Sequence, residues 1–265
     1  HFVIGQPYPA SLCARDAARL DEARRSLSVL GTQTQRILAA PGDVSREADV
    51  VRVTTAALAA FPTLQVLVNN AGVYGPMGPT ERVDWTEWMR AIEINLFGSV
   101  LMTRALVPHF KARNAGKIIQ LSGAGATKPL PNISAYAASK AAVVRFAETM
   151  AEELRPHHVD VNAVAPGALN TRMLDEVLAS GPEAVGRVFH EQSVEQKSKG
   201  GAPLERGAAL CVFLASTASD GLTGKLLSAV WDPWESCSKH RADLDGTDVY
   251  TIRRIVPADR GLVWE

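Results

Sequence analysis

The stretch LQVLVNN, residues 64–70, decides the fold class of this chain. Its apolar residues follow one another without a polar face, which is typical of a strand buried on both faces of a parallel sheet. A long apolar helical pattern follows at residues 84–110, and a second short apolar run, KIIQLSG, follows at residues 117–123. Because two parallel strands need a crossover connection between them, this order predicts a β-α-β unit.

The same alternation continues toward both ends of the chain. The predicted strands cover residues 10–14, 35–40, 64–70, 117–123, 159–166 and 225–230, and the predicted helices cover residues 16–27, 45–61, 84–110, 135–156 and 204–216. This pattern predicts an α/β fold, a Rossmann-like doubly wound parallel sheet with helices on both faces. We expect one domain over residues 1–231, a tail at residues 232–265 that packs on it, and a mobile flap at the glycine-rich segment 169–203.

Charge and cysteine content exclude several classes of function. Lysine plus arginine and aspartate plus glutamate number 28 each, so no net charge favours a nucleic acid as partner. The three cysteines, Cys13, Cys211 and Cys237, are too widely spaced for a zinc site and too few for a disulfide framework. No apolar run approaches the ~18 residues of a membrane span, and no signal-peptide pattern opens the sequence. We therefore expect a cytoplasmic protein that binds small molecules, with no metal, nucleic acid or membrane.

The stretch SAYAASK, residues 134–140, contains the first candidates for chemistry. Tyr136 and Lys140 are four residues apart on a predicted helix, so their Cβ atoms lie about 5–6 Å apart on one face. A nearby ammonium group favours the phenolate and lowers the pKa of a phenol. Such a tyrosine can exchange a proton with an alcohol or a ketone while hydride moves the other way. The same spacing is common in ordinary surface pairs, so further motifs must decide.

Four further motifs accompany this pair, and with them the chain resembles the short-chain dehydrogenase/reductase family over about residues 10–229. The four further motifs are GDVS at 42–45, NNAG at 69–72, EINLFG at 93–98 and APGALNT at 165–171, and they join SAYAASK at 134–140. The resemblance implies an NAD(P)(H)-dependent oxidoreductase that interconverts a secondary alcohol and a ketone. It also implies an alcohol or ketone substrate and assembly as a homodimer or homotetramer. An inactive or cofactor-poor relative that serves as a binding or assembly partner remains the alternative.

The resemblance assigns roles to individual residues. It implies Tyr136 as the acid/base and Lys140 as the residue that binds the ribose and lowers the pKa of the tyrosine. Asn95 would hold a water linked to the lysine in a proton relay. The implied cofactor contacts are Arg15, Asp43, Val44, Asn70, Ala71, Gly72, Tyr136, Lys140, Pro166, Gly167 and Thr171.

The serine that polarises the substrate oxygen departs from the family pattern. In the family it commonly stands thirteen residues before the tyrosine, and this chain has Gly123 there. Ser122 is one residue away, and one step along a strand turns a side chain to the other face. A bulge or a longer loop could bring it back to the site, so we expect Ser122 to be the catalytic hydroxyl. Thr127 and Ser134 are the alternatives.

The choice of cofactor depends on the end of the strand predicted at residues 10–14. A basic residue at this place accepts a 2′-phosphate, whereas an acidic residue selects a free ribose. Arg15 matches the basic position and favours NADP. Asp16 follows it and could instead cap the next helix, so NAD remains the alternative.

The beginning of the chain shows the largest departure from the family. Relatives open with a strand and a loop of the form T-G-x-x-x-G-x-G, ahead of the strand that residues 10–14 match. The sequence before Arg15 has no such loop, and too few residues separate HFVIG, residues 1–5, from the next strand for a crossover. We therefore expect the first strand and its glycine-rich loop to be absent, with HFVIG as a possible short strand in the vacant position.

Overall fold

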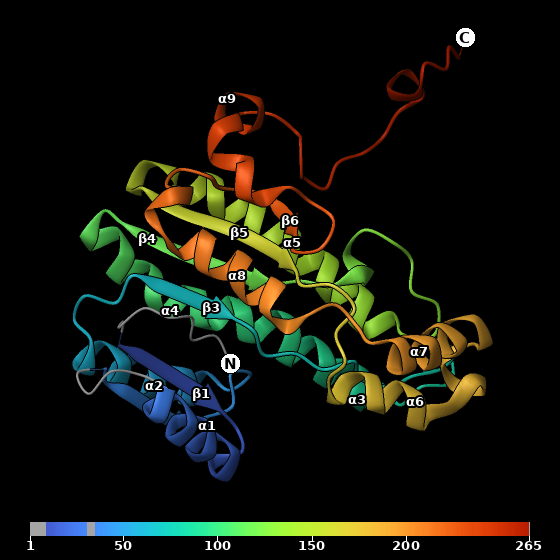
Figure 1. The fold of residues 1–265 in the computed structure, drawn as a ribbon, viewed down its shortest axis with the longest axis horizontal. Coiled ribbons are helices and arrows are strands. Elements are labelled where there is room, and N and C mark those ends of the chain that lie inside the picture. Colours follow the sequence, from blue (N-terminus) through green and yellow to red (C-terminus); the bar gives the residue numbers. More distant parts are fainter. Residues whose placement is uncertain (1–8, 31–34, 265) are drawn as a thin grey trace.

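The structure is a computed structural model that describes residues 9–30 and 35–264, and every strand pair among these residues is parallel (Figure 1). Hydrogen bonds divide the strands into two sheets. A two-stranded sheet contains β1 (Ala10–Ala14) and β2 (Ile37–Pro41), and a four-stranded sheet contains β3 (Val66–Asn69), β4 (Gly116–Leu121), β5 (Val159–Ala165) and β6 (Leu226–Ser228), in that order. The prediction of a parallel α/β fold is confirmed.

Helices connect these strands and cover both faces of the larger sheet. They are α1 (Ala17–Leu30), α2 (Glu47–Ala60), α3 (Trp85–Ile92), α4 (Gly98–Arg113), α5 (Ser134–Leu154), α6 (Arg172–Val185), α7 (Arg187–Lys199), α8 (Leu204–Ala215) and α9 (Arg241–Leu244). In Figure 1, α4 and α5 lie on one face of the four-stranded sheet and α8 lies on the other. The helices α1 and α2 pack against the two-stranded sheet.

Successive residues of the central strands enter two different cores, because side chains of a strand alternate between its faces. Ile118 of β4 and Val161 of β5 pack with residues of α4 and α5. Ile119 of β4 and Val164 of β5 pack with residues of α8. All four side chains are at most 1% exposed, so a strand in this position must be apolar at consecutive positions. This explains the continuous apolar runs of the sequence.

The predicted helix over residues 84–110 consists of three parts. A π-helical segment, Glu93–Phe97, joins α3 to α4. The whole stretch Trp85–Arg113 is long and apolar enough to cross a membrane by length and composition alone. Leu106 and Phe110 belong to the core cluster formed with α5, so packing against the sheet accounts for its apolar character.

The segment 169–203, expected as a mobile flap, contains the helices α6 and α7. Gly181, Gly186 and Gly200 have φ angles of 75°, 86° and 90°, which favour glycine, and they mark the breaks between helical pieces. The glycines in this segment therefore lie at a kink or at the ends of helices. A composition rich in glycine does not distinguish that arrangement from a loop.

The prediction that the chain lacks its first strand and glycine-rich loop is not supported. The described chain begins with a strand, β1, at Ala10–Ala14, early in the sequence. The prediction matched this strand to the second strand of the family by the order of the motifs, and that match alone does not establish an absence. The possible strand HFVIG, residues 1–5, lies outside the described residues.

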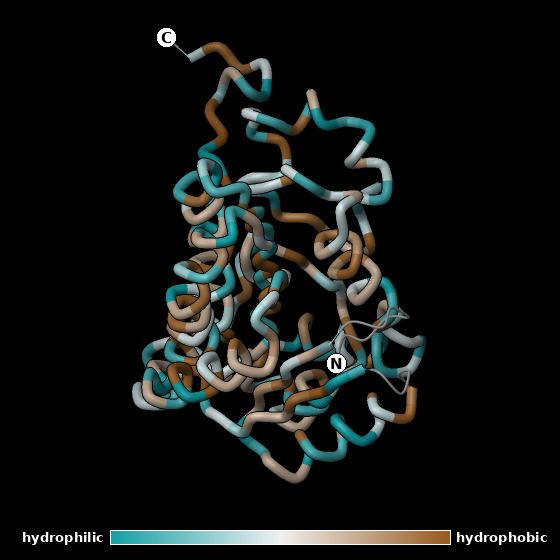
Figure 2. The backbone as a smooth tube through the Cα atoms, turned by 90° about the vertical axis from the view of Figure 1, so that its left-hand side faces the viewer, coloured by the Kyte–Doolittle hydropathy of each residue, from teal (hydrophilic) through white to brown (hydrophobic). Residues whose placement is uncertain are grey.

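The tail beyond β6 crosses the edge of the sheet and then leaves it. The backbone amide of Leu226 in β6 donates to the carbonyl oxygen of Tyr250 (2.8 Å), and Trp234 is buried against α8. The final residues extend away from the rest of the chain in both views (Figure 1, Figure 2). Trp264 near the end is 77% exposed.

Candidate active site

The helix α5 carries Tyr136 and Lys140 to the carboxyl end of β4. Lys140 Nζ donates to the carbonyl oxygen of Leu121, the last residue of β4, over 2.7 Å, and lies 5.7 Å from the centre of the Tyr136 ring. The lysine is 4% exposed, and burial lowers its pKa to about 8. Within the described residues it has no carboxylate partner. A buried cation without a counter-ion costs free energy, so this lysine is not present for stability alone.

The pKa of Tyr136 is raised, chiefly by burial and to a smaller extent by the neighbouring Tyr74. Burial therefore outweighs, in this structure, the lowering of the Tyr136 pKa by Lys140 that the sequence predicts. The reason is geometric: the lysine ammonium group points to the Leu121 carbonyl, and the desolvation of the phenolate outweighs it. Tyr136 consequently holds its proton at neutral pH.

Asn95 lies in the π-helical segment, where it ties α5 to the loop after β3. Its Oδ1 accepts from the backbone amide of Val73, and its Nδ2 donates to the carbonyl oxygen of the same residue, each over 2.8 Å. Nδ2 also donates to Ser139 Oγ (2.9 Å), and Ser139 Oγ donates to the carbonyl oxygen of Tyr136 (2.8 Å). π-Helical segments are frequent at functional sites. Here the segment holds the loop and the tyrosine-bearing helix in a fixed relation.

The NNAG motif at the carboxyl end of β3 has two separate contacts. Asn69 Nδ2 donates to the Thr103 hydroxyl (3.2 Å) and the Ser99 carbonyl oxygen (3.3 Å), both in α4. Gly72 lies against the lysine: a Cβ atom there would be 3.3 Å from Lys140 Nζ. Asn70 and Ala71 between them are exposed. The first contact braces the sheet, and the second places backbone beside the buried ammonium group.

Ser122 is buried just beyond β4, and its hydroxyl donates to the carbonyl oxygen of Lys140 (3.3 Å). The residue that faces the tyrosine is its neighbour: a Cβ atom at Gly123 would be 2.2 Å from Tyr136 Oη. Only glycine fits there while the tyrosine keeps this position. Of the alternatives, Thr127 is exposed, and the Ser134 hydroxyl accepts from Trp88 Nε1 (3.0 Å).

Asp43, one of the predicted cofactor contacts, is engaged by other side chains. Its Oδ1 accepts from the hydroxyl (2.6 Å) and the amide (3.0 Å) of Ser45, and its Oδ2 accepts from the Arg90 guanidinium of α3. Burial raises the pKa of Asp43, but the bonds from Ser45 and Arg90 together hold it below its usual value. Arg90 also pairs with Glu93 (3.0 Å). The sequence carries no local signal for Arg90, because its partner lies 47 residues away.

The sequence leaves open which of Arg15 and Asp16 contacts the cofactor and which caps the next helix, and the two residues have different surroundings in the structure. Asp16 Oδ1 accepts from the backbone amide of Arg19 (3.0 Å), which caps α1, and its carboxylate also pairs with the Arg19 side chain. Arg15 lines a cavity of about 310 Å³. Val73 and Arg90 line the same cavity, which therefore joins the end of β1 to the loop after β3.

The remaining predicted cofactor contacts lie at two places. Val44 packs against the start of α4, where a Cβ atom at Gly98 would be 2.7 Å from Val44 Cγ2. Pro166, Gly167 and Thr171 follow the carboxyl end of β5. Gly167 has a φ of 98°, and its backbone passes so close to Val230 that a Cβ atom would be 2.7 Å from Val230 Cγ2.

These residues lie along the carboxyl ends of the parallel strands, where open α/β sheets bind ligands. Tyr136, Lys140, Asn95 and Ser122 are connected through the bonds of α5, and Gly72 adjoins them. Arg15 and Asp43 form the other end of the row, at α3.

Comparison with known proteins identifies relatives of the whole arrangement. The family model for short chain dehydrogenase matches residues 4–180. The chain is 36% identical to 3beta-hydroxysteroid dehydrogenase 1 of Eggerthella lenta over 79% of each chain. It is 37% identical to trans-4-hydroxycyclohexanecarboxylate dehydrogenase of Sinomonas cyclohexanicum, over 65% of this chain and 61% of the relative.

Solved structures agree with these relatives. Levodione reductase superposes with a TM-score of 0.75 at 26% identity, covering 87% of this chain and 88% of the other. NAD⁺-bound xylitol dehydrogenase superposes with a TM-score of 0.73 at 23% identity, over 83% of this chain and 87% of the other, which shows the common fold. The match of the family model from residue 4 onward again gives no support to the predicted loss of the first strand and glycine-rich loop. The chain belongs to the short-chain dehydrogenase family, whose members are oxidoreductases of alcohols and ketones.

Proposed function

We propose that this enzyme interconverts a secondary alcohol and a ketone with NADP(H), using Tyr136 as the acid/base. The observation that carries the proposal is the buried Lys140 beside Tyr136, at the carboxyl end of β4 and without a carboxylate partner in the described residues. An ammonium group in this position stabilises a phenolate that forms next to it. The pair therefore suits a reaction in which the tyrosine loses and regains a proton.

The residues of this chain fit a nicotinamide dinucleotide, the cofactor class of the family. When bound, the cofactor supplies or accepts the hydride. We propose that Arg15, Asp43 and Val44 hold its adenosine end. Asn70, Ala71, Gly72, Pro166, Gly167 and Thr171 would line the rest of the site, together with Tyr136 and Lys140. The preference for NADP over NAD is supported by Arg15, which lines the cavity while Asp16 caps α1.

The proton chemistry follows from the two shifted pKa values. In the direction of ketone reduction, Tyr136 donates its Oη proton to the substrate oxygen, and its raised pKa means that the proton is present at neutral pH. The phenolate left behind is stabilised by Lys140, which is mostly protonated at pH 7 with a pKa of about 8. Tyr136 then regains a proton. For this step we propose the relay through Asn95, which is supported by the chain of bonds from Asn95 through Ser139 to α5.

The role of Ser122 as the hydroxyl that polarises the substrate oxygen stays a prediction. In this structure its buried hydroxyl donates to the Lys140 carbonyl oxygen. The predicted cytoplasmic location also stays a prediction. So does assembly as a homodimer or homotetramer, for which the 46% exposed Phe97 at the start of α4 offers an apolar contact.

We propose a secondary alcohol on a six-membered ring as the substrate class. The names of two relatives, at 36% and 37% identity, specify a hydroxysteroid and a hydroxycyclohexanecarboxylate. Both names describe a hydroxyl group on a ring. The test compares oxidation of trans-4-hydroxycyclohexanecarboxylate and of a 3beta-hydroxysteroid with NADP⁺ and with NAD⁺.

The decisive experiment measures this turnover in the wild-type enzyme and in Tyr136→Phe, together with NADPH binding by calorimetry. We expect Tyr136→Phe to lose activity at least about 1000-fold while it still binds NADPH. Tyr250→Phe makes the same chemical change in the tail and serves as the matched control. Retained activity in Tyr136→Phe would contradict the acid/base assignment. A folded enzyme that binds neither NADPH nor NADH would favour the alternative of a non-catalytic binding partner.

A further inference from the structure

A second tyrosine, Tyr74, stands beside the acid/base and is held there by the loop after β3. The residue before it, Val73, is bonded at both its amide and its carbonyl to the Asn95 side chain. The residue after it, Gly75, has a φ of 75°, and a Cβ atom there would be 2.6 Å from Ala91 Cβ of α3. The backbone on both sides of Tyr74 is therefore fixed, and its side chain has a defined position.

The two phenols lie together. The ring centroids of Tyr74 and Tyr136 are 4.7 Å apart, with the ring planes inclined at 57°. Burial raises the pKa of Tyr74, and the carboxylate of Glu176 in α6 adds to the rise. The Tyr74 hydroxyl thus keeps its proton at neutral pH and lies within electrostatic range of the helix that follows β5.

Both phenol hydroxyls are available to a ligand. Within residues 9–30 and 35–264 neither makes a hydrogen bond, whereas almost every other buried polar side chain does. The fully buried side-chain oxygens without a hydrogen-bond partner in these residues are Gln120 Oε1 and Glu148 Oε2. The phenol oxygens are not among them, so both reach open space.

The neighbouring strand end offers no competing hydroxyl in this arrangement. Gly123, which faces Tyr136 Oη, has no side chain, and a Cβ atom would be 2.2 Å from that oxygen. The Ser122 hydroxyl is turned away from it, to the carbonyl of Lys140. Tyr74 contacts the ring of Tyr136, and its hydroxyl makes no hydrogen bond within the described residues.

We propose that Tyr74 is a catalytic residue whose hydroxyl donates a further hydrogen bond to the substrate oxygen, beside the proton donor Tyr136. This inference rests on the proposed alcohol/ketone chemistry of Tyr136. During ketone reduction the carbonyl carbon receives the hydride, and the carbonyl oxygen takes the Oη proton of Tyr136. Tyr74 keeps its proton throughout and stabilises the charge that develops on this oxygen.

The test measures kcat and KM for trans-4-hydroxycyclohexanecarboxylate with NADP⁺ in Tyr74→Phe, Ser122→Ala and Tyr136→Phe. Tyr250→Phe is the matched control for the loss of a phenol hydroxyl outside the site. We expect Tyr74→Phe to lower kcat/KM about 10- to 100-fold, mainly through kcat, because one hydrogen bond to a developing oxyanion is lost. NADPH affinity and melting temperature should match those of the control, since the ring and its packing remain. Ser122→Ala should lose less than Tyr74→Phe.

The outcomes separate this inference from the function on which it rests. A Tyr74→Phe enzyme within about twofold of the control would overturn the role of Tyr74, and so would a larger loss in Ser122→Ala. A wild-type enzyme that turns over neither this probe nor a 3beta-hydroxysteroid would remove the proposed function itself, as would an active Tyr136→Phe. Loss in Tyr136→Phe alone would leave the proposed function in place and refute only the contribution of Tyr74.

Discussion

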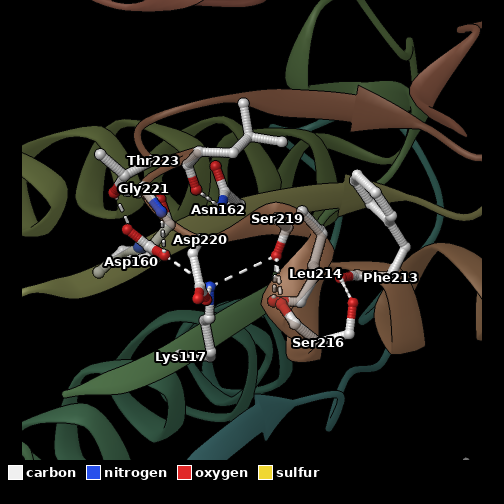
Figure 3. A network of polar contacts seen from close by, with 12 residues as sticks. Lys117, Asp160, Asn162, Phe213, Leu214, Ser216, Ser219, Asp220, Gly221 and Thr223 are labelled. Carbon is white, nitrogen blue, oxygen red and sulfur yellow. Dashed lines mark hydrogen bonds and ion pairs between the residues drawn. The ribbon is translucent and has the colours of Figure 1, made fainter. Parts of the chain in front are cut away.

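Two lysines lie at the two ends of β4, Lys117 with a 12% exposed side chain and Lys140 buried, and their surroundings differ. Lys117, near the amino end, contacts Asp160 (2.6 Å) and Asp220 (2.8 Å) in a polar network with Ser219 (Figure 3). Lys140 contacts the carboxyl end of the same strand through one carbonyl oxygen and has no carboxylate partner in the described part of the chain. A charge that is paired on two sides holds elements together. A cation left without a counter-ion can stabilise a negative charge that forms beside it during a reaction.

The network at the amino end joins segments that are far apart in the sequence. Asp160 of β5 also accepts from the backbone amide of Gly221, and Asn162 Nδ2 donates to the carbonyl oxygen of Leu222 (2.6 Å) (Figure 3). These bonds fix the turn before β6 to the start of β4 and β5. The amino end therefore secures the order of the sheet. At the carboxyl end, the Lys140 ammonium group has no counter-ion within the described residues.

The largest expected effect is the loss of activity in Lys140→Met. Without the ammonium group the Tyr136 phenolate has no nearby positive charge, so we expect kcat/KM to fall at least about 1000-fold. Stability should change little or rise, because methionine removes a buried cation that has no counter-ion. Steady-state kinetics and thermal melting check both parts. An active Lys140→Met enzyme would break the contrast between the two lysines.

Lys117→Met should show the opposite pattern. It leaves Asp160 buried without its cation, and the expected loss is about 3–5 kcal/mol in the free energy of unfolding. Activity per folded molecule should stay at the wild-type level. Urea unfolding measures the first quantity, and kinetics corrected for the folded fraction measure the second. The double variant with Asp160→Asn should recover part of the lost stability; no recovery would argue against the pair as the cause.

A pair of glycines at the ends of β4 sharpens the same contrast with smaller effects. An added Cβ atom at Gly116 would be 2.7 Å from Phe110 Cγ, and one at Gly123 would be 2.2 Å from Tyr136 Oη. We expect Gly116→Ala to cost about 1–3 kcal/mol of stability at nearly normal kcat. Gly123→Ala should displace the tyrosine and lower kcat about 10-fold or more. Equal effects of the two substitutions on kcat would contradict the assignment of stability to the amino end of β4 and of catalysis to its carboxyl end.

The pH dependence of stability provides the smallest and most specific test. Burial lowers the pKa of Lys140 from 10.5 to about 8, so between these values the unfolded chain binds more protons than the folded enzyme. The contribution of this group to stability therefore rises with pH from about 8 to about 10.5, and it is constant below that window. Melting temperatures of the wild type and Lys140→Met, compared from pH 7 to 10, should reveal this relative gain. Parallel curves would mean that the lysine is not desolvated.

The reaction itself should show the complementary trend. If protonated Lys140 is needed to stabilise the phenolate, kcat should fall as pH rises through about 8. Lys117→Met should retain the same fall, because its lysine does not contribute to the site. A pH profile that changes in Lys117→Met would count against this assignment.

Much of the fold could be predicted from local patterns. All six described strands overlap predicted segments, because burial on both faces of a sheet demands consecutive apolar residues. Six of the described helices, α1 to α5 and α8, overlap predicted segments as well. The helices α6 and α7 were missed, since glycines that interrupt helices resemble those of a loop. The π-helical turn at Asn95 was missed as well, because its residues have ordinary helical composition.

For the candidate site, local patterns indicated residues but not the contacts between them. Spacing placed Tyr136 and Lys140 on one face of α5, and the ends of predicted strands pointed to Arg15 and Gly72. The pairing of Arg90 with Asp43 and the contact between the tilted rings of Tyr74 and Tyr136 join segments 47 and 62 residues apart along the chain. No local pattern encodes such contacts.

The sequence by itself determined the parallel α/β order and the tyrosine–lysine pair, because periodicity and helical spacing are properties of neighbouring residues. Only the tertiary structure decided that Gly123 faces the tyrosine, that Ser122 turns to the Lys140 carbonyl, and that burial raises the pKa of Tyr136. These outcomes depend on which side chains and how much solvent surround each group. That environment exists only after distant segments have packed together.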